Sequence, residues 1–174
     1  MSVAKVLSGI ELSNQLTREI IIKATALKDV GHVIPHLAVI RTGSDLATSK
    51  YINLKRQAAM RLGMRFSEYQ YDDHSKTEEL LTKIHELNSD RSVQGIIVQL
   101  PLPNHINESL LLSSIHPIKD VDGLNPVNIG RLATMGEDLD IEMKHRNRYS
   151  LYDQLVNVPC AAISALYMMD ISFI

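Results

Sequence analysis

The stretch GIIVQLPLP, residues 95–103, decides the fold. Its first four residues are glycine and aliphatic residues without polar alternation, a pattern typical of a parallel strand whose two faces are both covered. Gln99 follows, and Pro101 and Pro103 then stiffen the backbone, because a proline fixes its own φ and restricts the residue before it. The stretch predicts a buried strand with a polar side chain at its carboxyl end and a rigid wall behind it.

Strand-like and helix-like patterns alternate on the amino-terminal side of this stretch and continue beyond it. The expected elements are a helix over 8–29, a strand over 36–40, a helix over 47–62 ended by Gly63, a strand over 65–71, a helix from a capping box at 75–78 to about Asn88, a strand over 93–100 and a short helix over 107–115 capped by Asn107. This order implies right-handed crossovers. We therefore expect an α/β fold, a parallel three-layer sheet with helices on both faces.

Composition and charge limit the function classes. The 174 residues include 18 basic and 20 acidic ones, a near-balance that predicts neither nucleic acid nor membrane partners. The single cysteine, Cys160, cannot form an internal disulfide and is a weak candidate nucleophile, so a reducing, cytoplasmic location is expected. No apolar run approaches the ~20 residues of a membrane helix.

Three loops are expected to meet at the carboxyl edge of the sheet, where α/β proteins bind their ligands. They are residues 42–48, 99–103 and 119–126. On the helix after the first loop, Tyr51 and Lys55 share one face with Cβ atoms ~5–6 Å apart. The ring can stack on a planar ligand and the amine can transfer protons, but the pair is also common on solvated helix surfaces.

The other two loops offer polar side chains with several uses. Gln99 can hold Lys55 by a hydrogen bond, or it can satisfy only a backbone group at the strand end. Asp120 and Asp122 point the same way if their segment is extended. A carboxylate here can accept paired N–H bonds from a heterocycle or bind a divalent metal, while a solvated turn capped by Asp120 is the structural alternative.

Some sites are not expected. The chain has no Gly-x-Gly-x-x-Gly and no phosphate-loop motif, and the loop at Gly43 has one glycine, so no dinucleotide cradle is visible. The segment around Asp122 lacks the repeated ligands of a calcium loop. We predict no metal site and assign no cofactor-binding residues from the sequence.

Three ordered motifs, YINLK at 51–55, GIIVQLPLP at 95–103 and KDVDG at 119–123, closely resemble the bifunctional methylenetetrahydrofolate dehydrogenase/methenyltetrahydrofolate cyclohydrolase family. The resemblance covers approximately the first 133 residues and implies a Rossmann-like catalytic domain. It implies catalytic roles for Lys55 as acid/base, Gln99 as the residue that orients it, and Asp122 as the pterin-binding carboxylate. It also implies that Tyr51 stacks on folate and that Thr48, in place of the usual serine, Leu100 and Pro101 bind substrate.

The resemblance further implies the reaction and its partners. The expected substrates are tetrahydrofolate derivatives: 5,10-methylenetetrahydrofolate is oxidised with NADP or NAD, and the methenyl product is hydrolysed to 10-formyltetrahydrofolate. A homodimer is a further expectation. The alternative is a truncated fragment that binds folate or dimerises without catalysis, because the family's NAD(P)-binding domain has no counterpart in the sequence.

Three regions are expected along the chain. Residues 1–134 form the folate-binding catalytic domain, residues 135–158 a linker or irregular insertion, and residues 159–174 the truncated start of the segment that leads to a missing NAD(P)-binding domain. Within the last region, residues 159–164 partly match the family's Pro-Cys-Thr-Pro-x-Gly segment, and residues 155–174 are apolar enough for a terminal helix.

Overall fold

Three parallel strands form the centre of the molecule. β1 (His36–Thr42) lies between β2 (Arg65–Tyr71) and β3 (Gly95–Val98), in the order β2-β1-β3. The computed structural model describes residues 8–29, 34–134, 159–160 and 164. Within these residues the predicted α/β fold with a parallel sheet is confirmed.

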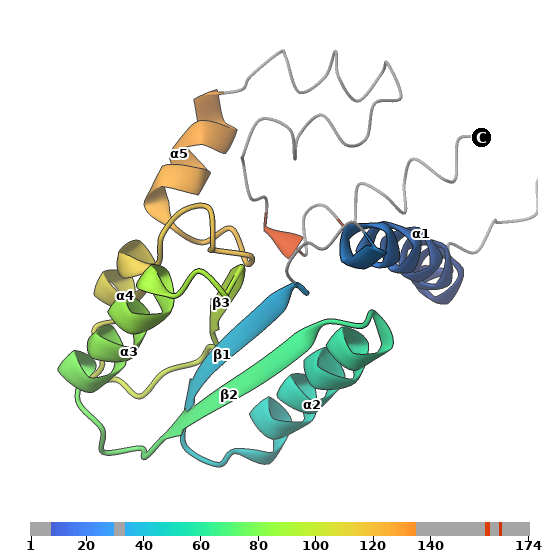
Figure 1. Cartoon of the computed structure of the whole chain (residues 1–174). Coiled ribbons are helices and arrows are strands. Elements are labelled where there is room, and N and C mark those ends of the chain that lie inside the picture. Colours follow the sequence, from blue (N-terminus) through green and yellow to red (C-terminus); the bar gives the residue numbers. More distant parts are fainter. Residues whose placement is uncertain (1–7, 30–33, 135–158, 161–163, 165–174) are drawn as a thin grey trace, which may run out of the picture.

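Helices cover both faces of the sheet (Figure 1). α2 (Leu46–Arg61) packs on one face, and α3 (Thr77–Ser89) and α4 (Glu108–Ser114) pack on the other. The other two helices, α1 (Gly9–Asp29) and α5 (Pro126–Thr134), lie outside these layers. Among the residues that the structure describes, no helix combines the length and the apolarity needed to cross a membrane.

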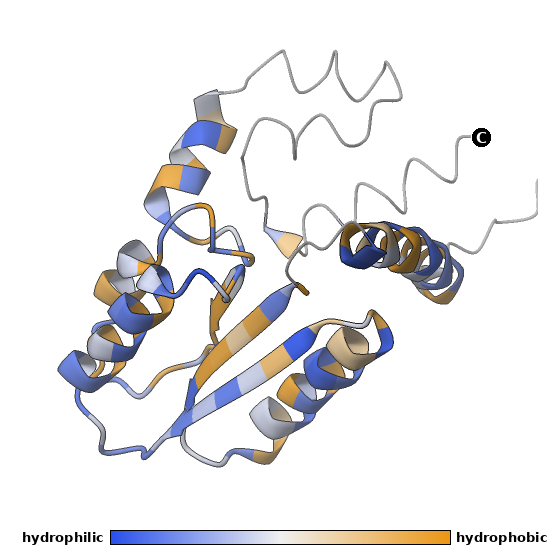
Figure 2. Cartoon of the chain, viewed as in Figure 1, coloured by the Kyte–Doolittle hydropathy of each residue, from blue (hydrophilic) through white to orange (hydrophobic). Residues whose placement is uncertain are grey.

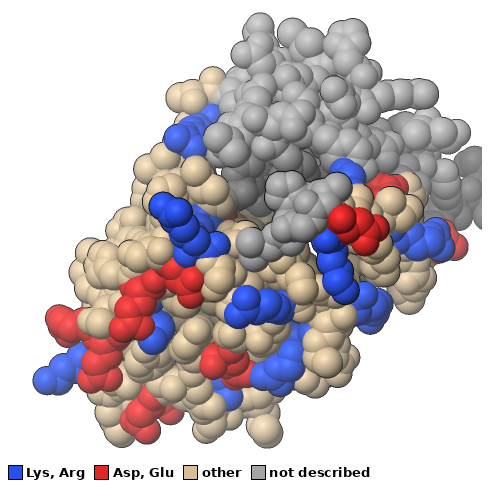
Figure 3. Space-filling view, viewed as in Figure 1, with Lys and Arg blue, Asp and Glu red and all other residues tan. Residues whose placement is uncertain are grey.

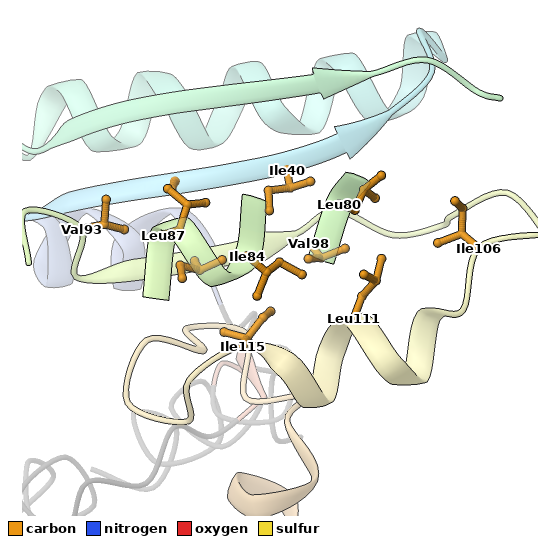
Figure 4. Close-up of a cluster of buried hydrophobic side chains, with 11 residues drawn as sticks. Ile40, Leu80, Ile84, Leu87, Val93, Val98, Ile106, Leu111 and Ile115 are labelled. Carbon is orange, nitrogen blue, oxygen red and sulfur yellow. The ribbon is translucent and has the colours of Figure 1, made fainter. Parts of the chain in front are cut away.

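The side chains of β1 alternate between two cores, one on each face of the sheet. Ala38 and Ile40 contribute to the cluster under α3 and α4, whereas Val39 packs with Ile52 of α2. Figure 4 shows the larger cluster, whose eleven buried members are Ala38, Ile40, Leu80, Ile84, Leu87, Val93, Ile96, Val98, Ile106, Leu111 and Ile115. Figure 2 shows that β1 is more hydrophobic than β2, as expected for a central strand beside an edge strand.

Most of the predicted elements agree with the structure to within two residues at each end. The strand predicted over 93–100 is shorter, since only Gly95–Val98 is strand. The capping box predicted at Ser75 is wrong: α3 begins at Thr77, its cap position is Lys76 without a side-chain cap bond, and the Thr77 hydroxyl accepts from the Asn107 amide at 3.0 Å. The Thr77 hydroxyl thus joins the start of α3 to the residue before α4, and no side-chain bond caps α3.

α5 is a helix that the sequence reading did not predict. It begins at Pro126, a residue favoured in the first turn of a helix, and Asn125 precedes it with its side-chain oxygen 2.8 Å from the amide of Val127. The predicted linker over 135–158 and most of the predicted terminal helix over 155–174 lie outside the described residues. Those two predictions, and the domain boundaries built on them, stay predictions.

Candidate active site

The start of α2 positions three of the predicted site residues. Gly43 leaves β1 with a φ of 67°, and the carboxylate of Asp45 accepts from the amide of Thr48 at 2.8 Å, which satisfies a free donor in the first turn. This amide bond holds the pKa of Asp45 below its ordinary value. Thr48, Tyr51 and Lys55 then follow at helical spacing and face the same side of α2.

Lys55 meets Gln99 across the sheet. The ammonium Nζ donates to Oε1 of Gln99 at 2.9 Å, and Nε2 of Gln99 donates to the carbonyl of Leu100 at 2.8 Å. With both ends of its amide engaged, Gln99 has one orientation, and its own backbone amide is fixed to Ile40 O at 2.8 Å. Gln99 therefore performs both of the alternatives considered from the sequence, since it holds the lysine and satisfies a strand-end carbonyl.

Asp120 and Asp122 have different surroundings. The segment is a turn, with the amide of Gly123 directed at the carbonyl of Asp120 at 3.4 Å, so the common direction expected for an extended segment is not found. Asp120 is 1% exposed and accepts from the amide of Asn125 at 2.8 Å and from Nδ2 of Asn128 at 2.9 Å. The solvated turn considered for Asp120 is therefore wrong, because this acid is buried and ties the loop to α5.

Asp122 is the carboxylate whose charge interacts with that of Lys55. Burial raises the pKa of Asp122, the nearby Asp120 raises it further, and the positive charge of Lys55 opposes both effects. Lys55, Gln99 and Asp122 thus come from α2, the end of β3 and the 119–126 loop to one place, as the three-loop expectation required. Their catalytic roles stay predictions.

The loop that carries Asp122 is anchored to the opposite side of the sheet. Nζ of Lys119 donates to the carbonyls of Leu87, Asn88 and Asp90 at 2.8, 2.8 and 2.7 Å, at the carboxyl end of α3. Burial lowers the pKa of Lys119. The loop also lies against β3, where a Cβ on Gly95 would come within 2.8 Å of Val121.

Cys160 reaches the site from the far end of the chain. Its Sγ donates to the carbonyl of Val121 at 3.5 Å. Although the residue keeps contact with solvent, partial desolvation raises the pKa of its thiol, and the carboxylate of Asp122 raises it further. The sequence reading treated Cys160 only as a weak nucleophile; the partial motif over 159–164 was the signal for its position.

A cavity of about 540 Å³ opens between the start of α2 and the segment that follows β3. It is lined by residues 42–46, Thr48, Asp73 and residues 101–103. Thr48 and Pro101, both predicted to bind substrate, lie in its wall, whereas the lining does not include Lys55, Gln99 or Asp122. Leu100 is half-buried, and Tyr51 is 63% exposed, which leaves its ring free to stack on a ligand.

A polar cluster beneath the cavity wall was missed by the sequence reading. Arg41 is buried at the end of β1 and forms an ion pair with Glu68, which also contacts Arg56. The sequence did contain a signal for this cluster: Arg41 and Glu68 each lie inside a strand, and charges that are buried in a sheet require partners.

The described residues do not fit a nucleotide cofactor. Gly43 provides the only glycine turn in the cavity wall, and a Cβ there would meet the carboxylate of Asp73 at 2.1 Å, so the space beside that turn holds an acid. A carboxylate disfavours the phosphates that glycine-rich turns bind. Within the described residues, no three of His, Cys, Asp and Glu gather as a metal site would require.

Charges of both signs occur on the molecular face shown in Figure 3. Acidic side chains gather toward the side of α3, whose first turn contains Glu78 and Glu79. Basic side chains lie nearer the middle of this face. The view therefore shows a mixed surface, in agreement with the net charge of -2.

Comparison with known proteins gives one consistent result. Residues 7–122 match the model of the tetrahydrofolate dehydrogenase/cyclohydrolase catalytic domain. The bifunctional protein FolD of Acetivibrio thermocellus is 45% identical over 129 residues, which are 74% of this chain and 45% of the relative. The chain therefore spans about half the length of the curated relatives it matches.

Solved structures agree. The bifunctional FolD enzyme of Campylobacter jejuni superposes with a TM-score of 0.83 at 33% identity, covering 97% of this chain and 53% of that one. The Trypanosoma brucei dehydrogenase-cyclohydrolase, solved with NADP cofactor and inhibitor, gives a TM-score of 0.82 at 29% identity and covers 100% of this chain and 54% of the other. Because the family model matches well over half of its residues, the chain belongs to the tetrahydrofolate dehydrogenase/cyclohydrolase family.

Proposed function

We propose that the chain binds 5,10-methenyltetrahydrofolate and hydrolyses it to 10-formyltetrahydrofolate, with Lys55 as the acid/base. The observation that carries the proposal is the bond of 2.9 Å from Lys55 Nζ to Gln99 Oε1, which aims the amine beside Asp122. Tyr51 stacks on the folate, Asp122 accepts N–H bonds from the pterin, and Thr48, Leu100 and Pro101 line the substrate path. Membership of the family supports these roles.

The hydrolysis needs one water molecule and a group that moves protons. Water attacks C11, the carbon between N5 and N10, and Lys55 in its neutral amine form accepts a proton from it. The C11–N5 bond then breaks as Lys55 returns a proton to N5, and the remaining hydroxyl proton leaves to solvent as the formyl carbonyl forms. Overall one proton is released. A positioned acid/base of this kind contributes on the order of 10²–10⁴-fold to a rate.

The solved relatives are named as dehydrogenases as well, and the Trypanosoma brucei enzyme was solved with NADP. When bound to such an enzyme, NADP or NAD accepts a hydride from the methylene group. The described residues of this chain do not fit the dinucleotide, for the reasons given at Gly43. We therefore propose only the hydrolysis for the part of the chain that the structure describes.

The test uses the chain with 5,10-methenyltetrahydrofolate and follows the loss of its absorbance. We expect Lys55→Met to lower the rate by at least about 100-fold. Lys50→Met is the matched control, because Lys50 is an exposed lysine on the same helix. Equal rates for wild type and Lys55→Met would remove Lys55 from the mechanism.

A second candidate function is association with another copy of the chain, without catalysis. The observation that favours association is the exposed surface of α1. This helix exposes several apolar side chains, with Ile10 76% and Ile22 69% exposed, and exposed apolar surface is common at interfaces. We infer a homodimer in which α1 takes part. Light scattering of Ile10→Ser/Ile22→Ser tests it: a smaller mass than the wild type supports the dimer, whereas an equal mass contradicts it.

We also infer that the protein works in the cytoplasm. The support is indirect: one cysteine, which suits a reducing compartment, and curated relatives that are bacterial FolD proteins. Fractionation of cells that express the whole gene, followed by immunodetection, tests the inference.

A further inference from the structure

Arg41 is a buried cation outside the group of Lys55, Gln99 and Asp122. It is 8% exposed and lies one residue before the end of β1, two positions after Val39. Alternation along the strand places it on the same face of the sheet as Val39, the face that α2 covers. A charge in this position requires partners on every side.

The two terminal guanidinium nitrogens of Arg41 donate hydrogen bonds, whereas Nε has a charge partner but no hydrogen bond of good geometry. Nε lies 2.6 Å from Oε1 of Glu68, and Nη2 donates to Oε1 of Gln70 at 2.9 Å. Nη1 donates to the carbonyl of Gly43 at 3.0 Å and to the hydroxyl of Ser49 at 3.2 Å. The planar fork of arginine thus connects β2, the turn after β1 and the first turn of α2.

The backbone that Arg41 holds is the cavity wall. Gly43 O accepts a second bond from Nε2 of Gln70 at 3.0 Å, and its amide donates to Tyr71 O at 2.9 Å. Residues 43–46 and Thr48 line the cavity, whereas Arg41 does not. The guanidinium therefore lies behind the wall and fixes its two ends, at Gly43 and at Ser49.

Stability alone is a poor explanation for this network. Removing two charges from water costs free energy that offsets most of their attraction, so apolar replacement of a buried ion pair is often neutral or stabilising. Directed hydrogen bonds, in contrast, select one geometry. The network therefore does one thing that apolar residues could not do: it fixes the backbone path of residues 43–48.

We propose that Arg41 is a positioning residue for the ligand-binding wall formed by residues 43–48. The proposal rests on the proposed function, because it assigns the wall to the binding of the folate. Arg41 acts through Gly43 and Ser49, and it touches neither the substrate nor Lys55.

The main test replaces the ion pair by apolar residues, in Arg41→Leu/Glu68→Leu. Of the partners left behind, Arg56 and Gln70 keep access to solvent, Gly43 O keeps its bond from Gln70, and Ser49 is half-buried. We expect a urea midpoint close to that of the wild type, a KM for 5,10-methenyltetrahydrofolate raised about tenfold, and a kcat changed by less than about twofold. The matched control is Lys83→Leu/Glu86→Leu, which removes an ion pair on α3, on the other face of the sheet.

A second variant covers the case in which the double variant does not fold. Arg41→Lys keeps the charge beside Glu68 but loses the fork that reaches Gly43 and Ser49. We expect it to raise the KM in the same way, with kcat again almost unchanged. An unchanged KM in folded Arg41→Lys or in the folded double variant would overturn the positioning role.

Amide hydrogen exchange separates this proposal from the proposed function. In the variants we expect faster exchange at Gly43 and Thr48, with no change at the core amides of β1, and this readout needs no substrate. If the wild type fails to hydrolyse the methenyl substrate, the proposed function fails, while faster exchange still supports positioning of the wall. Unchanged exchange at Gly43 and Thr48 contradicts the positioning role even in an active enzyme.

Discussion

The two faces of the sheet are held in different ways. Under α3 and α4 the contacts come from eleven buried apolar side chains. Under α2 the buried apolar cluster is Val39, Ile52 and Ile97, and polar contacts supplement it: Lys55 to Gln99 on one side, and Arg41 and Arg56 to Glu68 on the other. Apolar burial has no preferred direction, whereas hydrogen bonds do. One face therefore stabilises the fold, and the other orients the functional groups.

The largest expected effect tests the stabilising face. Ile84→Ala empties a fully buried position of the larger cluster, so we expect the free energy of unfolding to fall by about 2–5 kcal/mol. Urea denaturation measures it. Ile84→Val is the control, with an expected loss of about 0.5–1.5 kcal/mol. Equal losses for the two variants would contradict tight packing at this position.

A variant on the α2 face should show the opposite balance. Gln99→Met removes the acceptor of Lys55 Nζ, so the amine loses its orientation. We expect the rate of methenyl hydrolysis to fall by about 100-fold, while the unfolding free energy changes by only about 0.5–1.5 kcal/mol. Gln57→Met, at an exposed position of α2, is the control and should leave both unchanged. A large loss of stability without a loss of rate would show that Gln99 stabilises the fold and does not orient Lys55.

Two helix caps, one on each face, sharpen the comparison. Asn107→Ala removes the bond that the Leu110 amide donates to Oδ1 of Asn107 at 3.0 Å, and it should cost about 1 kcal/mol without a change in KM. Asp45→Ala removes the equivalent bond to Thr48, which lines the cavity. We therefore expect it to raise the KM. Steady-state kinetics measure the KM of both variants. An equal KM for the two would show that the Asp45 cap has no effect on substrate binding in the cavity.

The smallest expected effect concerns the pH dependence of stability. Burial raises the pKa of Asp122, so the folded protein binds this proton more tightly than the unfolded chain. As pH rises above the ordinary value of 3.8, the carboxylate must ionise against burial, and its contribution to stability falls. Asp122→Asn removes this penalty, so its urea midpoint at neutral pH should equal or exceed that of the wild type.

The control for Asp122→Asn is a change at an exposed carboxyl group. Asp29→Asn, a change of an exposed carboxyl at the end of α1, should leave the pH dependence of the urea midpoint unaltered. If Asp122→Asn is less stable than the wild type at neutral pH, the attraction between Asp122 and Lys55 outweighs the cost of burial.

The fold was largely predictable where local pattern and tertiary packing agree. The strand over 65–71 and the helix ended by Gly63 follow from periodicity and a glycine with positive φ. The capping box at Ser75 was wrong because the cap position is Lys76, without a side-chain bond, and the Thr77 hydroxyl instead accepts from the Asn107 amide, which is distant in sequence. α5 was missed because its fixation depends on Asp120 and Asn128, a bond across eight residues that periodicity does not contain.

The candidate site divides in the same way. The meeting of Lys55 with Gln99 followed from the strand ends and the family resemblance, because both place polar side chains at one edge of the sheet. The network of Arg41 did not follow, since pairing Arg41 with Gln70 requires the register between β1 and β2. Cys160 was not placed either, because its contact with Val121 joins residues 39 positions apart.

Lys119 gives the order in which heat should loosen the molecule. Its three bonds to carbonyls at the end of α3 attach the Asp122 loop to a helix terminus, and helix termini fray before strands open. Fraying of that last turn would free Lys119, while the bonds of Asp120 to Asn125 and Asn128 and the bond from Ile96 N to Lys119 O still hold the loop to β3 and α5. We therefore expect amide exchange in the last turn of α3 to quicken with temperature before exchange in the sheet.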